Sequence, residues 1–184
     1  MNTIYSLIET RRTVHSYCAE SIDQNLLEKI ARAGHFAPCH KHTWPWRFTL
    51  VGPETRAGLA ELAVQVKAEK QSLTEEKKRA IRDKITAPGG LVVVSQVKSE
   101  DAFRAKEDYA AVSCAIQNIQ LAAHAESLGA KWSTGAITRD ARTYEILGID
   151  VELEEIVGFV WIGIPRVVPA IKRPEFETVV RRLK

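Results

Sequence analysis

The sequence predicts one domain in which helices pack around a single sheet, an α/β or α+β arrangement. Apolar stretches with helical spacing alternate along the chain with short stretches typical of strands. The length of 184 residues is close to that of one domain, so residues 1–184 are expected to fold as a unit. With 45% hydrophobic and 27% charged residues, the chain has the composition of a globular protein.

The first third of the chain predicts two helices and a strand. Apolar residues at helical spacing begin at Ile4, and this short helix should end before Arg11. A second helix should follow Ser21 and end near Gly34, as glycine commonly follows a last helical turn. A proline-bounded polar loop comes next, and residues 47–51 alternate in the manner of a strand.

The middle of the chain predicts helices around a buried strand. Residues 54–84 have a helical composition, and their charged end is expected to face solvent. Leu91–Val94 is apolar throughout, the pattern of a strand buried on both faces. The longest apolar helix is expected over 109–128. Because it is rich in alanine on nearly all sides, it should be buried all round, against the sheet or a second subunit.

The last third predicts one more helix and the strongest strand. Residues 129–137 contain small residues and are expected to form a helix-to-loop connection. A short helix is expected over 139–147, followed by a strand over Ile156–Ile162. Three prolines then mark an extended tail that closes with a short segment over 175–184.

Charge and cysteine usage limit the possible function classes. The net charge of +3 is too small to indicate nucleic-acid binding. Three widely spaced cysteines without a C-x-x-C pair are typical of an intracellular protein. The N-terminus lacks the pattern of a signal peptide, and no apolar run approaches the roughly 20 residues of a membrane helix. We therefore expect a soluble, cytoplasmic protein with no membrane partner.

The first candidate site is Arg11-Arg12-Thr13, directly after the first helix. Two guanidinium groups beside a hydroxyl suit a phosphate, because arginine binds its oxygens in pairs. The alternative is a helix C-terminus at which cations are favoured by the helix dipole. The residues alone leave both interpretations open.

The second candidate is the loop 37–48, which carries a thiol, two histidines, a lysine and two tryptophans. Aromatic and cationic groups together suit a flat, partly anionic ring system, although the tryptophans could instead pack into the core. Zinc is disfavoured because Cys39, His40 and His42 have no fourth ligand at usable spacing. A cysteine–histidine hydrolase is also disfavoured, since neighbouring side chains in extended backbone point apart.

Two further segments offer donors. Small residues in 129–137 would let a ligand approach backbone N–H groups, although an ordinary connection is the simpler interpretation. Residues 171–174 add basic side chains that could equally be solvated. A basic nucleic-acid module using these residues and Arg11-Arg12 is a minor alternative, and no Rossmann or P-loop fingerprint occurs.

In this order, the segments resemble motifs of the nitroreductase-like family of FMN-dependent flavoproteins, and the resemblance covers essentially the whole chain. Its compact subgroup is indicated by Cys39-His40-Lys41 and Trp132–Ile137. The matching segments are Arg11–Thr13 for R-R-S/T, Ala37-Pro38 with Pro45–Phe48 for A-P-S-x-x-N-x-Q-P-W-x-F, Gly158 with Trp161–Pro165 for G-x-x-x-I-G-x-P, and Lys172–Pro174 for the closing basic segment.

The resemblance implies an α+β fold with a central, mostly antiparallel sheet flanked by helices. It implies an intertwined homodimer with two FMN sites at the interface, and we expect residues 109–128 to form the dimer contact. NAD(P)H would pass a hydride through flavin N5 to an electron-poor acceptor, such as a nitroaromatic or quinone, by a ping-pong mechanism. Alternatives are an FMN-binding protein for storage or sensing, or a relative that oxidises its substrate with O₂.

The resemblance also implies residue roles, with the chemistry carried by the flavin rather than by a catalytic side chain. Two side chains depart from the family pattern: His42 stands at its asparagine position and Trp44 at its glutamine position. The implied FMN contacts are Arg11, Arg12 and Thr13 at the phosphate and ribityl chain, Lys172 or Arg173 closing the phosphate clamp, Trp132, Ser133 and Thr134 along the ring, Phe36 as an apolar contact, and His40 reaching the flavin of the partner subunit.

Overall fold

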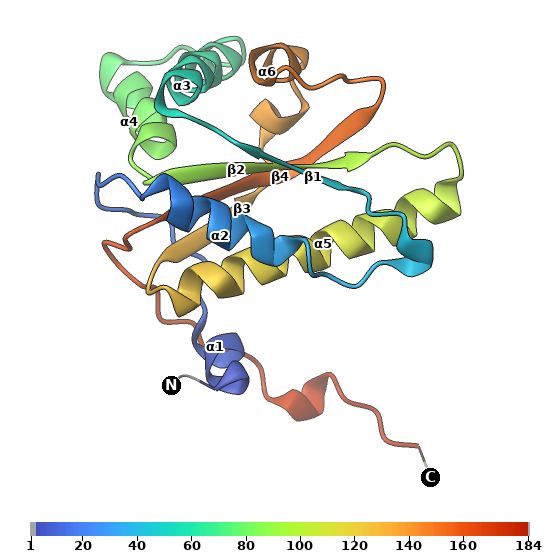
Figure 1. The fold of residues 1–184 in the computed structure, drawn as a ribbon. Coiled ribbons are helices and arrows are strands. Elements are labelled where there is room, and N and C mark those ends of the chain that lie inside the picture. The colour runs from blue at the N-terminus through green and yellow to red at the C-terminus, as the bar shows by residue number, and fades with distance from the viewer. Residues whose placement is uncertain (1–2, 184) are drawn as a thin grey trace.

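A computed structural model describes residues 3–183 of the chain. Its centre is a four-stranded antiparallel sheet with strand order β1-β2-β4-β3 (Figure 1). This architecture confirms the α+β fold with a central, mostly antiparallel sheet. The strands are β1 (Trp46–Leu50), β2 (Gly90–Val97), β3 (Gly129–Ser133) and β4 (Glu154–Gly163).

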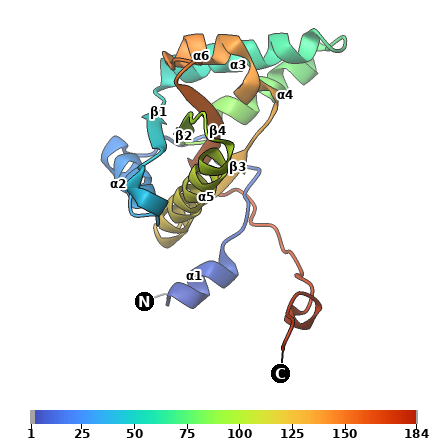
Figure 2. The same cartoon turned by 90° about the vertical axis from the view of Figure 1, so that its right-hand side faces the viewer.

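Helices cover both faces of the sheet, which gives three layers (Figure 2). One layer contains α2 and α5, and the opposite layer contains α3, α4 and α6. Helix α1 projects from the body. The helices are α1 (Ile4–Thr10), α2 (Gln24–Gly34), α3 (Pro53–Ala68), α4 (Glu75–Thr86), α5 (Ala102–Ala125) and α6 (Ala141–Leu147), with short 3₁₀ turns η1 (His40–His42), η2 (Ala136–Arg139) and η3 (Phe176–Thr178).

Capping side chains explain where several helices begin. The Thr74 hydroxyl accepts a hydrogen bond from the Lys77 amide and starts α4, so the predicted helical stretch 54–84 is two helices joined by a turn. Asp101 caps α5 in the same way, through the amides of Phe103 and Arg104. Helix α5 therefore begins seven residues earlier than the predicted 109, because apolar periodicity does not reveal a polar first turn.

Two hydrophobic cores lie on opposite faces of the sheet. Val92 and Val94 face α2 and α5, whereas Leu91 and Val93 face the other helical layer. All four side chains are fully buried, which confirms the prediction of a strand buried on both faces. Strand β4 divides its side chains between the same two cores, so the two predicted strands of highest hydrophobicity form the middle of the sheet.

The prediction of a helix-to-loop connection over 129–137 is wrong for its first half, which forms β3 at the edge of the sheet. Strand β3 pairs with β4 from Gly129 opposite Gly163 to Ser133 opposite Phe159. Its short, glycine- and alanine-containing sequence has little strand propensity of its own. The pairing partner, rather than the local sequence, makes this segment a strand.

The prediction that the long helix is buried all round is wrong for the single chain. The outer face of α5 leaves Tyr109, Ala110 and Cys114 exposed, while its inner face is fully buried against the sheet. Helix α1 and the C-terminal tail extend away from the body (Figure 1). Within residues 3–183, no helix combines the length and apolarity needed to cross a bilayer.

Candidate functional site

The segment between α1 and α2 lies against the edge of the sheet, and its residues line two separate cavities. Thr13 pairs with Ala130 of β3 in parallel, and Tyr17 pairs with Pro165 after β4. The Val14 amide donates a hydrogen bond to the Ala130 carbonyl at 3.1 Å. This contact requires a glycine at 129, because a Cβ there would lie 2.6 Å from Cγ2 of Val14.

The first cavity, of about 270 Å³, lies at the C-terminal end of α5 and is basic. Arg11, Arg12 and His124 line it, together with the small residues at the start of β3. The Nη1 atom of Arg11 is buried in the structure without a hydrogen-bond partner. Burial lowers the pKa of Arg11, and the charges of Arg173 and Arg12 lower it further. Arg173 of the tail does not line this cavity, although its charge acts on Arg11.

The two adjacent arginines differ in their surroundings. Arg12 Nη1 donates hydrogen bonds to the carbonyl oxygens of Glu9 at 2.6 Å and of Arg11 at 2.9 Å. Arg12 therefore stabilises the end of α1, because a positive charge is favourable at the C-terminus of a helix. The helix-dipole interpretation therefore applies to Arg12, while the phosphate interpretation stays a prediction for Arg11. Arg11 keeps a buried donor for an anion, and an unpaired buried donor is costly unless a ligand satisfies it.

His124 also lines the basic cavity, and no motif in the sequence predicts this. Its Nε2 atom lies 2.8 Å from the Thr10 hydroxyl, which ties α1 to the end of α5. Burial lowers the pKa of His124, and the charges of Arg11 and Arg12 lower it further. An anion in this cavity would therefore face three basic side chains, those of Arg11, Arg12 and His124.

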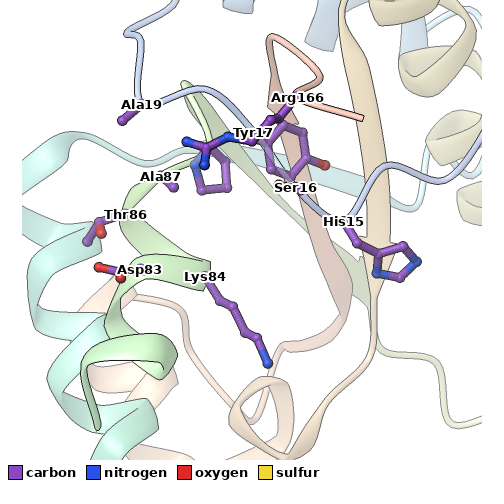
Figure 3. Close-up of a pocket in the computed structure, with 10 residues that line it drawn as sticks. His15, Ser16, Tyr17, Ala19, Asp83, Lys84, Thr86, Ala87 and Arg166 are labelled. Atoms are coloured by element: carbon purple, nitrogen blue, oxygen red, sulfur yellow. The ribbon is translucent and has the colours of Figure 1, made fainter. Parts of the chain in front are cut away.

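The second cavity, of about 420 Å³, lies on the other side of the same segment (Figure 3). Figure 3 shows His15 and Lys84 at its rim, with Arg166 above the ring of Tyr17. Lys131 on β3 is partly buried, and burial together with the charge of Lys84 lowers its pKa. The basic residues that line this cavity come from the segment after α1, from α4 and from the chain after β4, so no single local motif predicts the whole group.

The predicted ring-lining residues lie at the far end of β3. Trp132 points toward α5 and its Nε1 donates to the Val157 carbonyl at 3.4 Å. Ser133 points to the opposite face, where its hydroxyl accepts from Trp161 Nε1 at 2.9 Å, and Thr134 follows as an exposed residue. Among residues 3–183, only Thr13 pairs with the outer edge of β3. That edge therefore presents backbone donors beyond Ala130.

Phe36 and His40 lie elsewhere. The exposed Phe36 follows α2, and His40 Nε2 is 4.0 Å from Glu107 Oε1 near the start of α5. Glu107 and His124 are separated by about 25 Å of helix axis at the usual rise per residue. One chain therefore does not bring His40 to the basic cavity that holds Arg11, and Phe36 does not line that cavity.

The thiol and histidines of the loop do not form a metal cluster. Across residues 3–183, no three His, Cys, Asp or Glu side chains gather in a way that could hold a metal ion. The Cys39 Sγ atom instead lies 3.2 Å from the Thr43 hydroxyl and accepts from the Trp44 amide at 3.2 Å. Cys39 thus shapes the loop.

Known proteins share both the sequence pattern and the fold. The Nitroreductase family model matches residues 8–164. A Bacillus subtilis protein named "Putative NAD(P)H nitroreductase YfhC" is 30% identical over 175 residues, covering 94% of this chain and 89% of the relative. The solved nitroreductase-like family protein from Bacillus cereus has a TM-score of 0.85 at 26% identity, covering 100% of this chain and 97% of that one. A nitroreductase with bound FMN from Bacteroides fragilis shares the fold, with a TM-score of 0.76 at 23% identity and full coverage of both chains. The chain belongs to the nitroreductase family.

Proposed function

We propose that this protein binds FMN and transfers electrons from NAD(P)H to an electron-poor acceptor such as a nitroaromatic or a quinone. Family membership, the name of the Bacillus subtilis relative and the FMN bound to the Bacteroides fragilis structure support this proposal. The observation that carries it is the buried, unpartnered Nη1 of Arg11 in a cavity bordered by further basic groups. Such a donor fits a phosphate, whose oxygens would satisfy it.

The phosphate end of FMN would occupy the basic cavity. Arg11 would donate to the phosphate oxygens, and Arg173 would approach from the tail to complete the clamp, with Lys172 beside it. Arg12 would add positive charge without leaving the end of α1. Thr13, held against β3 by its backbone, would offer a hydroxyl to the phosphate or ribityl chain.

The ring end of FMN would follow the outer edge of β3. Backbone N–H groups there would donate to ring heteroatoms, and Trp132, Ser133 and Thr134 would form the adjacent wall. His15 and Lys84, at the rim of the second cavity, would place positive charge where a reduced ring carries negative charge. Bound FMN would supply two-electron transfer, while these residues fix its orientation and electrostatics.

We propose that two copies of the chain pair through the exposed outer face of α5. A two-fold axis across this helix would set the start of α5 in one subunit beside its end in the other. His40, which lies near the start of α5, would then approach the basic cavity of the partner subunit, and the exposed Phe36 after α2 would add an apolar contact. The projecting α1 and C-terminal tail, which expose apolar side chains, would cover the partner.

An absorption spectrum of the purified protein, measured together with its mass in solution, tests the proposal. We expect the visible bands of oxidised flavin on a dimer, and bleaching of these bands on anaerobic addition of NADH or NADPH. A colourless protein that takes up no added FMN would refute the proposal. Bound FMN without turnover of any acceptor would favour storage or sensing, and products formed only in air would favour substrate oxidation by O₂.

A further inference from the structure

We propose that His42 and Trp44 form an aromatic platform that binds the planar, electron-poor acceptor, and that Thr43 and Asp108 are positioning residues for it. The proposal rests on the proposed function for the identity of the ligand as an acceptor. Its structural basis is the loop between α2 and β1, which lies beside the start of α5 (Figure 1).

The backbone of this loop is strained. Lys41, His42 and Trp44 have φ angles of 52°, 54° and 46°. Apart from glycine, only Ser127 among residues 3–183 shares a positive φ. The left-handed conformation is unfavourable for a residue with a side chain, and such residues persist where the surroundings hold them for a function. Three of them within four positions indicate a loop conformation that other contacts must maintain.

A polar network inside the loop supplies those contacts. The Thr43 hydroxyl donates a hydrogen bond to Asp108 Oδ1 at 2.6 Å, and Asp108 is only 5% exposed. Cys39 Sγ lies 3.2 Å from the same hydroxyl and accepts from the Trp44 amide. Arg104 is 3.9 Å from the other oxygen of Asp108. Because Asp108 belongs to α5, it anchors the loop to a rigid element.

The loop holds two aromatic rings parallel to each other. The rings of His42 and Trp44 stack with centroids 5.4 Å apart and an angle of 8°. The indole of Trp44 also contacts the edge of buried Trp46 and lies 6.2 Å from the ring of His35. Despite these contacts Trp44 remains 48% exposed. A large aromatic side chain that is fixed but open to solvent is suited to stack on a ligand.

The chemistry of the platform selects its ligand. The face of an indole is electron-rich and stacks favourably on an electron-poor ring. Exposed Lys41 beside it favours an acceptor with anionic or carbonyl groups over a cation. In the proposed dimer this loop reaches the cofactor cavity of the partner subunit. The platform would then hold the acceptor ring next to the flavin.

Calorimetric titration with 4-nitrobenzoate, without NAD(P)H, tests the platform separately from turnover. We expect Trp44→Leu to weaken binding at least about fivefold, and Trp44→Phe, which keeps an aromatic face, to weaken it less. Thr43→Val should weaken binding by loosening the loop, with a loss of near-ultraviolet circular dichroism from the stacked indole. FMN content and dimer mass are measured on every variant.

The outcomes separate the two proposals. Unchanged affinity in Trp44→Leu, or no binding of 4-nitrobenzoate by the natural sequence, would overturn the platform even if FMN is bound. Equal binding of benzyltrimethylammonium would also overturn it, because the face would then select a cation. Absence of FMN from the natural sequence would instead refute the proposed function. If Thr43→Val fails to fold, the half-exposed Trp44 variants still decide the platform.

Discussion

The indole of Trp132 lies directly over the α carbon of Gly158. A Cβ at Gly158 would come within 2.1 Å of Trp132 Nε1 and 2.6 Å of its Cδ1. Side-chain atoms cannot approach so closely, so only glycine at 158 admits this indole between β3 and α5. The contact sets the position of the Trp132 ring through a strand residue that has no side chain of its own.

We expect Gly158→Ala to displace Trp132 and to lower the free energy of unfolding by about 1–3 kcal/mol, the usual cost of overpacking. For a chain of this size, each kcal/mol lowers the melting temperature by about 2–4 °C. The measurement is thermal unfolding followed by circular dichroism, with FMN affinity measured alongside.

Gly58→Ala is the matched control for this prediction. Gly58 lies inside α3, and a Cβ there would come no closer than 4.0 Å to Ile146. The same substitution should therefore stabilise the protein by about 0.5–1 kcal/mol through helix propensity. A Gly158→Ala protein as stable as the natural one would show that Trp132 does not occupy this position.

The sheet shows which elements a sequence can predict. Leu91–Val94 and Ile156–Ile162 are recognisable because burial on both faces requires a continuous apolar run. Strand β3 was missed because Gly129, Ala130 and Lys131 have weak strand propensity, and its pairing partners lie far away in sequence. Local preference predicts the strands at the centre of this sheet but not the strand at its edge.

The candidate site shows the same division. Arg11–Thr13 is a candidate from the sequence because one short segment carries several groups suited to a phosphate. The sequence alone does not indicate Lys84, Lys131 or His124 as candidates. These residues belong to α4, β3 and α5, and they come near the segment after α1 only in the folded chain. The exposed face of α5 is a related case: alanine content predicted burial, whereas the single chain buries one face only.

Arg11→Met tests the phosphate clamp. Loss of hydrogen bonds from a charged donor should weaken FMN binding by about 1.5–3 kcal/mol, or roughly 10- to 150-fold. Methionine keeps the apolar stem and removes a buried donor that has no partner. Without FMN, the variant should therefore be at least as stable as the natural protein. FMN titration and chemical unfolding of the flavin-free protein measure the two effects.

Arg79→Met serves as the control for charge removal, because Arg79 lies exposed on α4 away from the basic cavity. Its FMN affinity should equal that of the natural protein. If Arg11→Met also binds FMN with unchanged affinity, the phosphate does not lie at Arg11 and the cofactor orientation proposed above is wrong.

Ala110→Glu tests the dimer contact. Ala110 lies exposed on the outer face of α5, between Tyr109 and Cys114 of the same turn region. A carboxylate there would be buried against its symmetry mate, where unpaired charge is costly. We expect a monomer that has lost most of its FMN, as measured by light scattering and absorbance. Ala57→Glu is the control, because Ala57 is an exposed residue of α3, and this variant should remain dimeric. If the Ala110→Glu protein is a dimer with its full flavin content, the outer face of α5 is not the interface.

The last prediction concerns His124 and pH. Its pKa is lowered in the folded protein, first by burial and then by Arg11 and Arg12, from an ordinary value near 6.5. The unfolded chain therefore binds more protons than the folded chain as pH falls through 6.5 and below. By linkage, this difference lowers the free energy of unfolding as the pH falls below about 6.5, and it has no effect above that pH, where His124 is neutral in both states.

His124→Gln keeps a hydrogen-bonding side chain opposite Thr10 and removes the titration. Without FMN, the melting temperature of the natural protein should fall more steeply between pH 7.5 and 5.5 than that of His124→Gln. Bound phosphate would offset the charges of Arg11 and Arg12, raise the pKa of His124 and reduce the difference between the two proteins. Parallel melting curves without FMN would contradict the pKa shift. A difference that persists unchanged with FMN would place the phosphate away from His124.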